Sequence, residues 1–351
     1  MNTTTACFAA PASKVALIAL ILLAGCATDP KTTSSGGSLP TDSTENSESA
    51  PKAGMSRGRM TVNGASYDSL GKLVRAVGET AGEGGLVLVA GLEEWPSPSI
   101  SVERATYHNG ISRLVAPSNL KVFDGEAYQF IYPPGYETLL DVTLGDTVAP
   151  RFQSLRATYA VGAGTDLFNA LALLSETLGF TVLADNEIAD AWCGELFLCD
   201  APAPSILEAL LRSARIVPGS IVVENSDSYI FIRSARNKAP LDTCVNRDTL
   251  SAEAAAMLTK QVNLQLPRNK PNLQFQNRAA PIKSVIDDMS RQLGVSVVVS
   301  PEMAAFPINP AVFSDMNLSD VLNLIVRQWP EADFGYRVTR DQVQFCMRVR
   351  G

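Results

Sequence analysis

The sequence predicts an α+β protein of three tandem small modules, each a β-α-β-β-α-β-β unit with a sheet and two helices. Three observations support this. The same amphipathic helix occurs three times, a glycine follows each copy directly, and a short run of apolar residues, rich in β-branched side chains, comes after each glycine. One such match could arise by chance, but three copies with the same stop signal are typical of a repeated unit.

The first helix of each module has apolar residues at the spacing i, i+3, i+4, i+7 and i+11, which is one face of an α-helix. The three sets are Leu70, Leu73, Val74, Val77 and Ala81; Leu167, Ala170, Leu171, Leu174 and Leu178; and Ile282, Val285, Ile286, Met289 and Leu293. Gly82, Gly179 and Gly294 follow, and glycine favours a helix C-terminus because it adopts the left-handed conformation.

The other elements follow in order. Buried strands are expected at 86–89, 180–183 and 295–299, and shorter helices at 111–115, 207–214 and 318–325. Each module closes with a hairpin, which turns at Asp124–Gly125, at 225–228 and at Arg340–Asp341. The strand before the first helix is clearest at 272–276, where apolar and polar residues alternate, and weaker around 152–159.

In the third module, Ala280-Pro281-Ile282 opens the first helix, 292–295 (Gln-Leu-Gly-Val) ends it, and 317–322 (Asn-Leu-Ser-Asp-Val-Leu) begins the second. With these features the module resembles the short N-terminal (N0-like) domain of bacterial secretins and TonB-dependent receptors. The second module repeats the pattern at 177–180 and 205–210, and the first fits loosely, with extra glycines at Gly84 and Gly85. The resemblance implies the fold of each module, but a fold does not specify a task.

We therefore expect six regions. They are a signal peptide (1–25), a disordered tether (26–57), a divergent module 1 (58–136), module 2 (137–236), a partly helical linker (237–271) and module 3 (272–351). Within the linker, the alanine-rich stretch Ser251–Lys260 is expected to be helical.

The N-terminus predicts export. Lys14 precedes nine apolar residues, 15–23, which are too few for a permanent span of about 30 Å, since that needs roughly 20 residues. Leu23-Ala24-Gly25-Cys26 resembles the lipobox of bacterial lipoproteins, which implies cleavage before Cys26 and its acylation, with palmitate among the chains. The alternative is an ordinary signal peptide. Ala27 follows instead of aspartate, and by family analogy this implies the outer membrane, facing the periplasm.

The tether and the charge balance limit the partners. Residues 27–57 are rich in Ser, Thr, Gly, Pro and Glu and lack aromatic residues, so they cannot bury enough surface to order themselves. Such a chain spans on the order of 30 Å on average. The whole sequence has 29 basic and 36 acidic residues, a net charge of −7. This excess argues against nucleic acid or anionic lipid as the principal ligand.

Four cysteines remain after Cys7 leaves with the signal and Cys26 is acylated. In an oxidising compartment we expect Cys193 to pair with Cys199 and Cys244 with Cys346, although the sequence leaves the other pairings open. A metal site would need CxxC-type spacing and usually histidines, and the chain has one histidine in all. We expect neither a metal nor a cofactor.

No catalytic constellation assembles. Gly54–Gly58 matches G-x-S-x-G but lies in the expected tether, and Ser69–Lys72 matches S-x-x-K without the S-D-N or K-T-G that accompany it in the enzymes. His108 lies on an expected turn with no partner motif. The sequence thus predicts a protein that is not an enzyme.

Sheet edges bind partners by strand addition, and this makes the last strands of modules 2 and 3 candidate contacts, the alternative being that both are ordinary central strands. Their residues are Tyr229, Ile230, Phe231 and Ile232, and Gln342, Val343, Gln344 and Phe345. In secretins the resembling domains form periplasmic rings. The chain is therefore expected to be an outer-membrane lipoprotein that docks onto secretin-like or other ring proteins of a secretion, conjugation or type IV pilus machine. The alternative is a periplasmic module for TonB-type signalling or peptidoglycan binding, and a homo-oligomer is left open.

Overall fold

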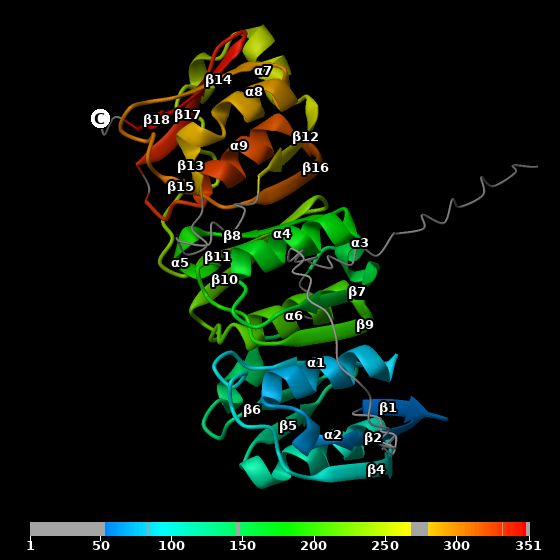
Figure 1. Cartoon of the computed structure of the whole chain (residues 1–351). Helices are drawn as coiled ribbons and strands as arrows, with labels where there is room; N and C mark the ends of the chain where they lie inside the picture. Colours follow the sequence, from blue (N-terminus) through cyan, green and yellow to red (C-terminus); the bar gives the residue numbers. More distant parts are fainter. Residues whose placement is uncertain (1–52, 83, 145–147, 268–279, 332, 349–351) are drawn as a thin grey trace, which may run out of the picture. The chain divides into compact units, whose positions relative to one another are not determined.

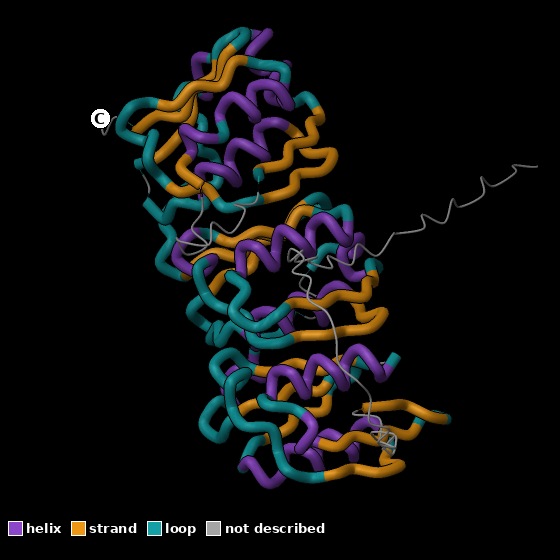
Figure 2. The backbone as a smooth tube through the Cα atoms, in the orientation of Figure 1, coloured by secondary structure: helices purple, strands orange, loops and turns teal. Residues whose placement is uncertain are grey.

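The computed structural model describes residues 53–82, 84–144, 148–267, 280–331 and 333–348, all of which lie in the compact unit Ala50–Gly351. The fold is mixed α+β, with nine α-helices and several small sheets among the described residues. Three segments of the chain follow one another, which we call the first (53–144), the second (148–236) and the third (242–348). Helices and strands alternate along each of them (Figures 1 and 2).

The elements of the first segment are β1 (Ala53–Ser56), β2 (Arg59–Asn63), α1 (Leu70–Ala81), β3 (Gly85–Leu88), β4 (Ser101–Ala105), α2 (Tyr107–Val115), β5 (Lys121–Asp124) and β6 (Gln129–Tyr132). Those of the second are α3 (Pro150–Gln153), β7 (Arg156–Val161), α4 (Leu167–Leu178), β8 (Thr181–Ala184), α5 (Asn186–Ala189), β9 (Leu196–Pro202), α6 (Ala203–Ser213), β10 (Ile221–Asn225) and β11 (Tyr229–Ser234). Those of the third are α7 (Ala252–Leu258), β12 (Gln261–Leu266), β13 (Ala280–Pro281), α8 (Ile286–Leu293), β14 (Ser296–Val299), β15 (Pro307–Ile308), β16 (Ala311–Asn317), α9 (Leu318–Arg327), β17 (Phe334–Val338) and β18 (Gln342–Met347).

Strand pairing follows one scheme in all three segments. An antiparallel ladder joins β2 to β4, β7 to β9 and β12 to β16, and each ladder contains a register shift. A second sheet joins β3 to β6, β8 to β11 and β14 to β18 in parallel, and its hairpin partner is β5, β10 or β17. Near each register shift a non-glycine residue has a positive φ, namely 50° at Arg104, 42° at Asp200 and 50° at Asp315.

The helices begin and end where local sequence dictates. Ser69 caps α1 by accepting a hydrogen bond from the Lys72 amide, and Gly82, Gly179 and Gly294 end α1, α4 and α8 with φ near +65°. The third predicted helix is 3₁₀ in its first turn, Ile282–Ser284, before α8 begins. The alanine-rich stretch forms α7 as predicted.

Two expectations need correction. The sequence predicts a single sheet per module, but in every segment the ladder and the hairpin sheet are separate, and β13 and β15 add a two-stranded sheet to the third. Five helices, α1, α2, α4, α8 and α9, contact strands of both the ladder and the hairpin sheet of their segment. The reason is that the strand before each first helix pairs with the strand before the second helix, away from the hairpin. Residues 53–56 of the expected tether form β1, which pairs with β2.

The start of the third segment also differs. The strand expected at 272–276 lies outside the described residues, and the strand that precedes α8 in the ladder is β12, within the predicted linker. Leu264 and Leu266 of β12 are buried, so its alternation does face a core.

The hydrophobic interior divides between the second and third segments. One core cluster runs from Met60 to Ile232, and a second comprises the third segment together with Leu183 and Phe231 of the second. Between the first two segments β9 pairs with β3, giving a five-stranded sheet in the order β5-β6-β3-β9-β7. No such ladder joins the second segment to the third among the described residues.

Candidate functional site: strand edges and the joints between segments

The predicted contact strands are not edges, which corrects the sequence-based assignment. Strand β11, with Tyr229–Ile232, lies between β10 and β8, and β18, with Gln342–Phe345, lies between β14 and β17. Both are central because the chain inserts the last strand of the hairpin beside the strand that follows the first helix. Ile230, Phe231, Ile232, Val343 and Phe345 are buried in the cores.

The residue at one helix position determines whether the outward backbone groups of the next strand are bonded to a side chain or are free to pair with another strand. Gly78, Ser175 and Ser290 each lie four residues before the glycine that ends their helix. The Ser175 hydroxyl accepts from the Val182 amide and donates to its carbonyl, both at 2.9 Å, and so takes the place of a neighbouring strand. Ser290 accepts in the same way from the Val297 amide at 2.9 Å.

In the first segment this position is Gly78, which leaves the edge of β3 free to pair. Leu86 of β3 pairs with Phe197 of β9 instead of with a hydroxyl, and the bonds from the Leu88 amide to the Glu195 carbonyl and from the Cys199 amide to the Gly84 carbonyl flank this pair. A Cβ at Gly78 would lie 2.8 Å from the Cβ of Phe197. Glycine is therefore required for β9 to approach.

The joint between the first and second segments contains a buried arginine. The Arg212 guanidinium donates to the Leu140 and Val142 carbonyls and to the Tyr128 hydroxyl, and lies 5.2 Å from the Phe123 ring centroid. The amide of Ala90 donates to the carbonyl of Ser213, the next residue.

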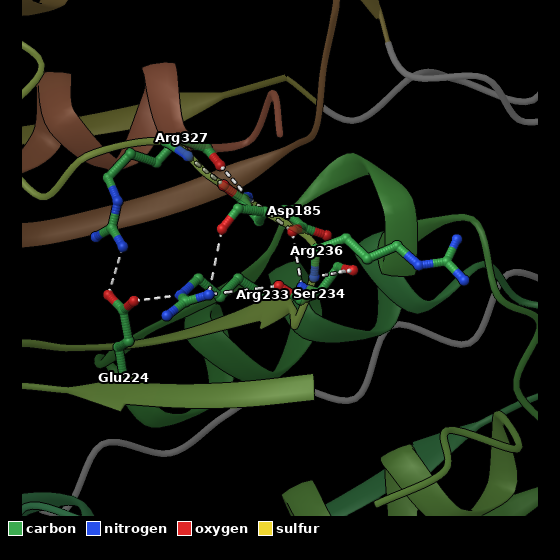
Figure 3. A network of polar contacts seen from close by, with 8 residues as sticks. Asp185, Glu224, Arg233, Ser234, Arg236 and Arg327 are labelled. Carbon is green, nitrogen blue, oxygen red and sulfur yellow. Dashed lines mark hydrogen bonds and ion pairs between the residues drawn. The ribbon is translucent and has the colours of Figure 1, made fainter. Parts of the chain in front are cut away.

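The second joint repeats these contacts with different partners. The Arg327 guanidinium lies 4.9 Å from the Phe231 ring centroid, and the amide of Asn186 donates to the carbonyl of Gln328. Glu224 on β10 binds Arg327 through one carboxylate oxygen and Arg233 through the other, each at 2.5 Å (Figure 3). Burial raises the pKa of Glu224, but its hydrogen bonds to Arg327 and Arg233 and their charges outweigh this, so the pKa is lowered overall.

Asp185 lies beside this clamp. It accepts from the Ser234 amide and from the Asn237 side chain, both at 2.8 Å, and the Arg236 amide donates to the Ser234 hydroxyl (Figure 3). Burial raises the pKa of Asp185, although the bonds from Asn237 and Ser234 act against it. The second joint therefore has a polar interface where the first has a strand ladder.

The two joint arginines are not among the residues that the sequence patterns single out. Arg212 and Arg327 directly follow the apolar stripes of α6 and α9, at the tenth residue of each helix. A charged residue at the same position of two repeated helices indicates a shared role and could have been found from the sequence. Glu224 gave none, because its role depends on two distant arginines.

The four cysteines are free in the structure, so the expected pairs are not formed. Cys193 is buried, which raises the pKa of its thiol to about 12, and the extended strand β9 carries Cys199 away from it. Cys244 and Cys346 lie in register with Tyr336 and Gly335, neighbouring positions of β17 whose side chains point to opposite faces.

The catalytic candidates are dispersed. Ser56 lies on β1, Ser69 caps α1, and Lys72 pairs with Asp68. His108 Nδ1 lies 2.5 Å from Asp124 Oδ1, but among the described residues no serine, threonine or cysteine side chain is bonded to this histidine. Nor do three or more His, Cys, Asp or Glu side chains of the described ranges cluster as metal ligands.

Cys26 lies outside the described residues, and within the described part no helix is both long and apolar enough to cross a bilayer. In comparisons with models of protein families, with curated proteins and with solved structures, nothing matches this chain.

Proposed function

We propose that the chain is a non-catalytic outer-membrane lipoprotein, anchored through Cys26, that docks its periplasmic segments onto ring proteins of an envelope-spanning secretion, conjugation or type IV pilus machine. In this proposal the three segments are copies of one secretin N0-like module. The observation that carries it is the recurrence of one pairing scheme, in which each segment has an antiparallel ladder and a parallel strand pair extended by a hairpin, and the first helix of the segment contacts both.

Further details support a common module. Each ladder has its register shift beside a residue of positive φ, and each first helix ends at a left-handed glycine. Small α+β modules with exposed edges suit protein docking, since edge strands add further strands. The lipobox-like Leu23–Cys26 and the tether after it support a fixed position at the membrane.

The anchor can be tested separately from the docking. Cells that express the full chain are labelled with radioactive palmitate, and Cys26→Ser serves as the matched variant. We expect the wild type to be labelled and to fractionate with the outer membrane, and the variant to lose the label. Equal labelling of both proteins would contradict lipidation at Cys26.

Docking is tested by isolating the full-length lipoprotein in mild detergent from its native cells. Co-purifying ring components of a secretion or pilus machine would support the proposal. A lone inner-membrane regulator would favour TonB-type signalling instead, and recovery with the sacculus without any protein partner would favour peptidoglycan binding.

A further inference from the structure

Strand β10 is an edge whose outward backbone groups can be identified. Among the described residues it pairs only with β11. The Ala235 amide bonds to the Ser220 carbonyl and the Ser226 amide to the Tyr229 carbonyl, which fixes the alternation along the ladder. Val222 therefore bonds to β11, whereas the amides and carbonyls of Ile221 and Val223 face away from the sheet.

This edge is apolar. Ile221 and Val223 are half-buried at the rim of the first core, while Val222 and the nearby Val217 are 37% and 47% exposed. Exposed edges are usually blunted by charge. Strand β5 of the first segment follows that rule, since Lys121 pairs with Glu137 and Asp124 pairs with His108. The one charge of β10, on Glu224, is held by two arginines.

The third segment shows the corresponding edge in a filled form. Tyr336 of β17 and Val223 of β10 are equivalent positions of their sheets. Tyr336 pairs with Phe345, whose carbonyl accepts from the Ser300 amide. In the same way Val223 pairs with Ile232, whose carbonyl accepts from the Asp185 amide. The Tyr336 amide donates to the Thr243 carbonyl at 3.0 Å, and its carbonyl accepts from the Val245 amide at 2.8 Å.

The chain seals the rest of that edge with a side chain. Asn246 accepts from the Val338 amide at 3.0 Å and donates to the Val338 carbonyl at 2.8 Å. The bridge between Cys244 and Tyr336 is parallel. An uncharged stretch, residues 243–246, which passes through the bridge at Cys244 and turns at Val245–Asn246, thus satisfies in the third segment the edge that corresponds to the outer edge of β10.

We propose that the outer edge of β10 binds an extended, uncharged segment of a partner protein by parallel strand addition, as β17 binds Thr243–Val245. The partner is the ring protein of the proposed function, on which this inference rests. An apolar residue of the added strand would cover Ile221 and Val223. A second copy fits less well, because two antiparallel β10 strands paired at Val223 would set Glu224 opposite Val222.

The probe is a synthetic peptide that copies residues 241–247 with serine in place of Cys244. It is added to the full chain in mild detergent, and amide exchange is followed by hydrogen–deuterium methods. We expect exchange at the Val223 amide, the equivalent of the Tyr336 amide, to slow about tenfold when the peptide is at ten times its dissociation constant. The same peptide with an N-methylated valine at the Val245 position should not bind, since it lacks the donor.

Variants of the chain provide the matched control. Val223→Pro removes an outward N–H and spares the ladder with β11, so it should abolish peptide binding. Val122→Pro makes the same change on β5, where Val122 also faces outward, and should leave binding unchanged. The N-methyl peptide keeps the test valid if either variant fails to fold.

Three results would overturn the inference. The first is no slowing of exchange at Val223 with millimolar peptide, and the second is equal binding of the N-methylated peptide. The third is exchange at Val223 that slows with rising protein concentration in the absence of peptide, which would indicate a second copy. The proposed function fails separately. If ring components co-purify with Val223→Pro as well as with the wild type, docking stands and β10 is not the contact.

Discussion

At the scale of single residues, the position four before the helix-ending glycine controls the strand that follows. A serine there bonds both the amide and the carbonyl of one strand residue, as Ser175 does for Val182, and the strand is then closed to a neighbour. A glycine leaves both groups to an incoming strand and leaves room for its side chain, as Gly78 does for Phe197. The pairing of β3 with β9 is therefore encoded largely by the absence of one hydroxymethyl group.

Replacing Ser175 by alanine should destabilise the second segment. The hydroxyl is fully buried, and its loss leaves the Val182 amide without an acceptor and removes the one hydroxyl hydrogen that the Val182 and Leu171 carbonyls share, which costs about 2 kcal/mol in the free energy of unfolding. Urea denaturation followed by circular dichroism measures this. Ser290→Ala is the matched variant at the half-buried site and should cost less; a larger loss there would contradict the explanation.

Gly78→Ala tests whether the pairing of β3 with β9 depends on a glycine at this position. Its Cβ would meet Phe197, which belongs to the backbone-paired strand β9, so the two strands must move apart. We expect a loss of about 1–3 kcal/mol in unfolding free energy, together with faster amide exchange at Leu86 and Phe197. Gly54→Ala is the control, because no heavy atom lies within 4 Å of a Cβ placed there. Unchanged exchange in Gly78→Ala would show that the strands do not depend on this glycine.

At the scale of elements, β10 is attached to the third segment by one carboxylate. Glu224 lies between Arg233 of the neighbouring strand and Arg327 of α9. Its pKa is lowered overall, so the ionised form stabilises the folded state above the ordinary value of 4.5, and this contribution is lost as the pH falls through the lowered pKa.

We therefore expect Glu224→Gln to unfold more easily than the wild type at pH 7, by about 1–3 kcal/mol, and the difference to shrink as the pH falls below 4.5. Urea titrations of both proteins between pH 7 and pH 3 measure it. Asp185 has a raised pKa and favours the folded state as the pH falls, but it is present in both proteins and largely cancels in the difference. A difference that is constant with pH would contradict a role for the ionised carboxylate.

Elements with strong local patterns were predictable, and those set by distant pairing were not. The stripes ending at Gly82, Gly179 and Gly294 predicted α1, α4 and α8, since burial of one helix face has a local period. Periodicity does not tell which strand lies beside which. For that reason the sequence predicts edges where β11 and β18 are central, predicts one sheet where the ladder and the hairpin sheet are separate, and does not single out Arg212 and Arg327.

At the scale of the whole molecule, both joints have a buried arginine and a backbone hydrogen bond. The free ends of the array, on the first and third segments, lack the corresponding residues. Arg212 and Arg327 each lie twelve residues after the positive-φ residue beside the register shift of their ladder, Asp200 and Asp315 respectively. The corresponding residue of the first segment is Ala116. The segment that precedes each joint supplies a backbone donor. The amides of Ala90 and Asn186, which are the second residues after β3 and β8, donate to carbonyls of the following segment. The second residue after β14 is Pro301, which has no amide hydrogen.

Ala116 and Pro301, which stand where the joints have an arginine and an amide donor, predict that the array does not continue from one chain to the next. Joining the third segment of one copy to the first of another would lack both the buried arginine and the joint hydrogen bond. We therefore expect the non-lipidated chain (Cys26→Ser) to sediment without head-to-tail polymers in analytical ultracentrifugation. Restoring both features with Ala116→Arg and Pro301→Asn should produce association that increases with concentration, and each single variant should produce less. Head-to-tail polymers of the protein without these changes would contradict the prediction, because they would show that such a joint forms without its arginine and its amide donor.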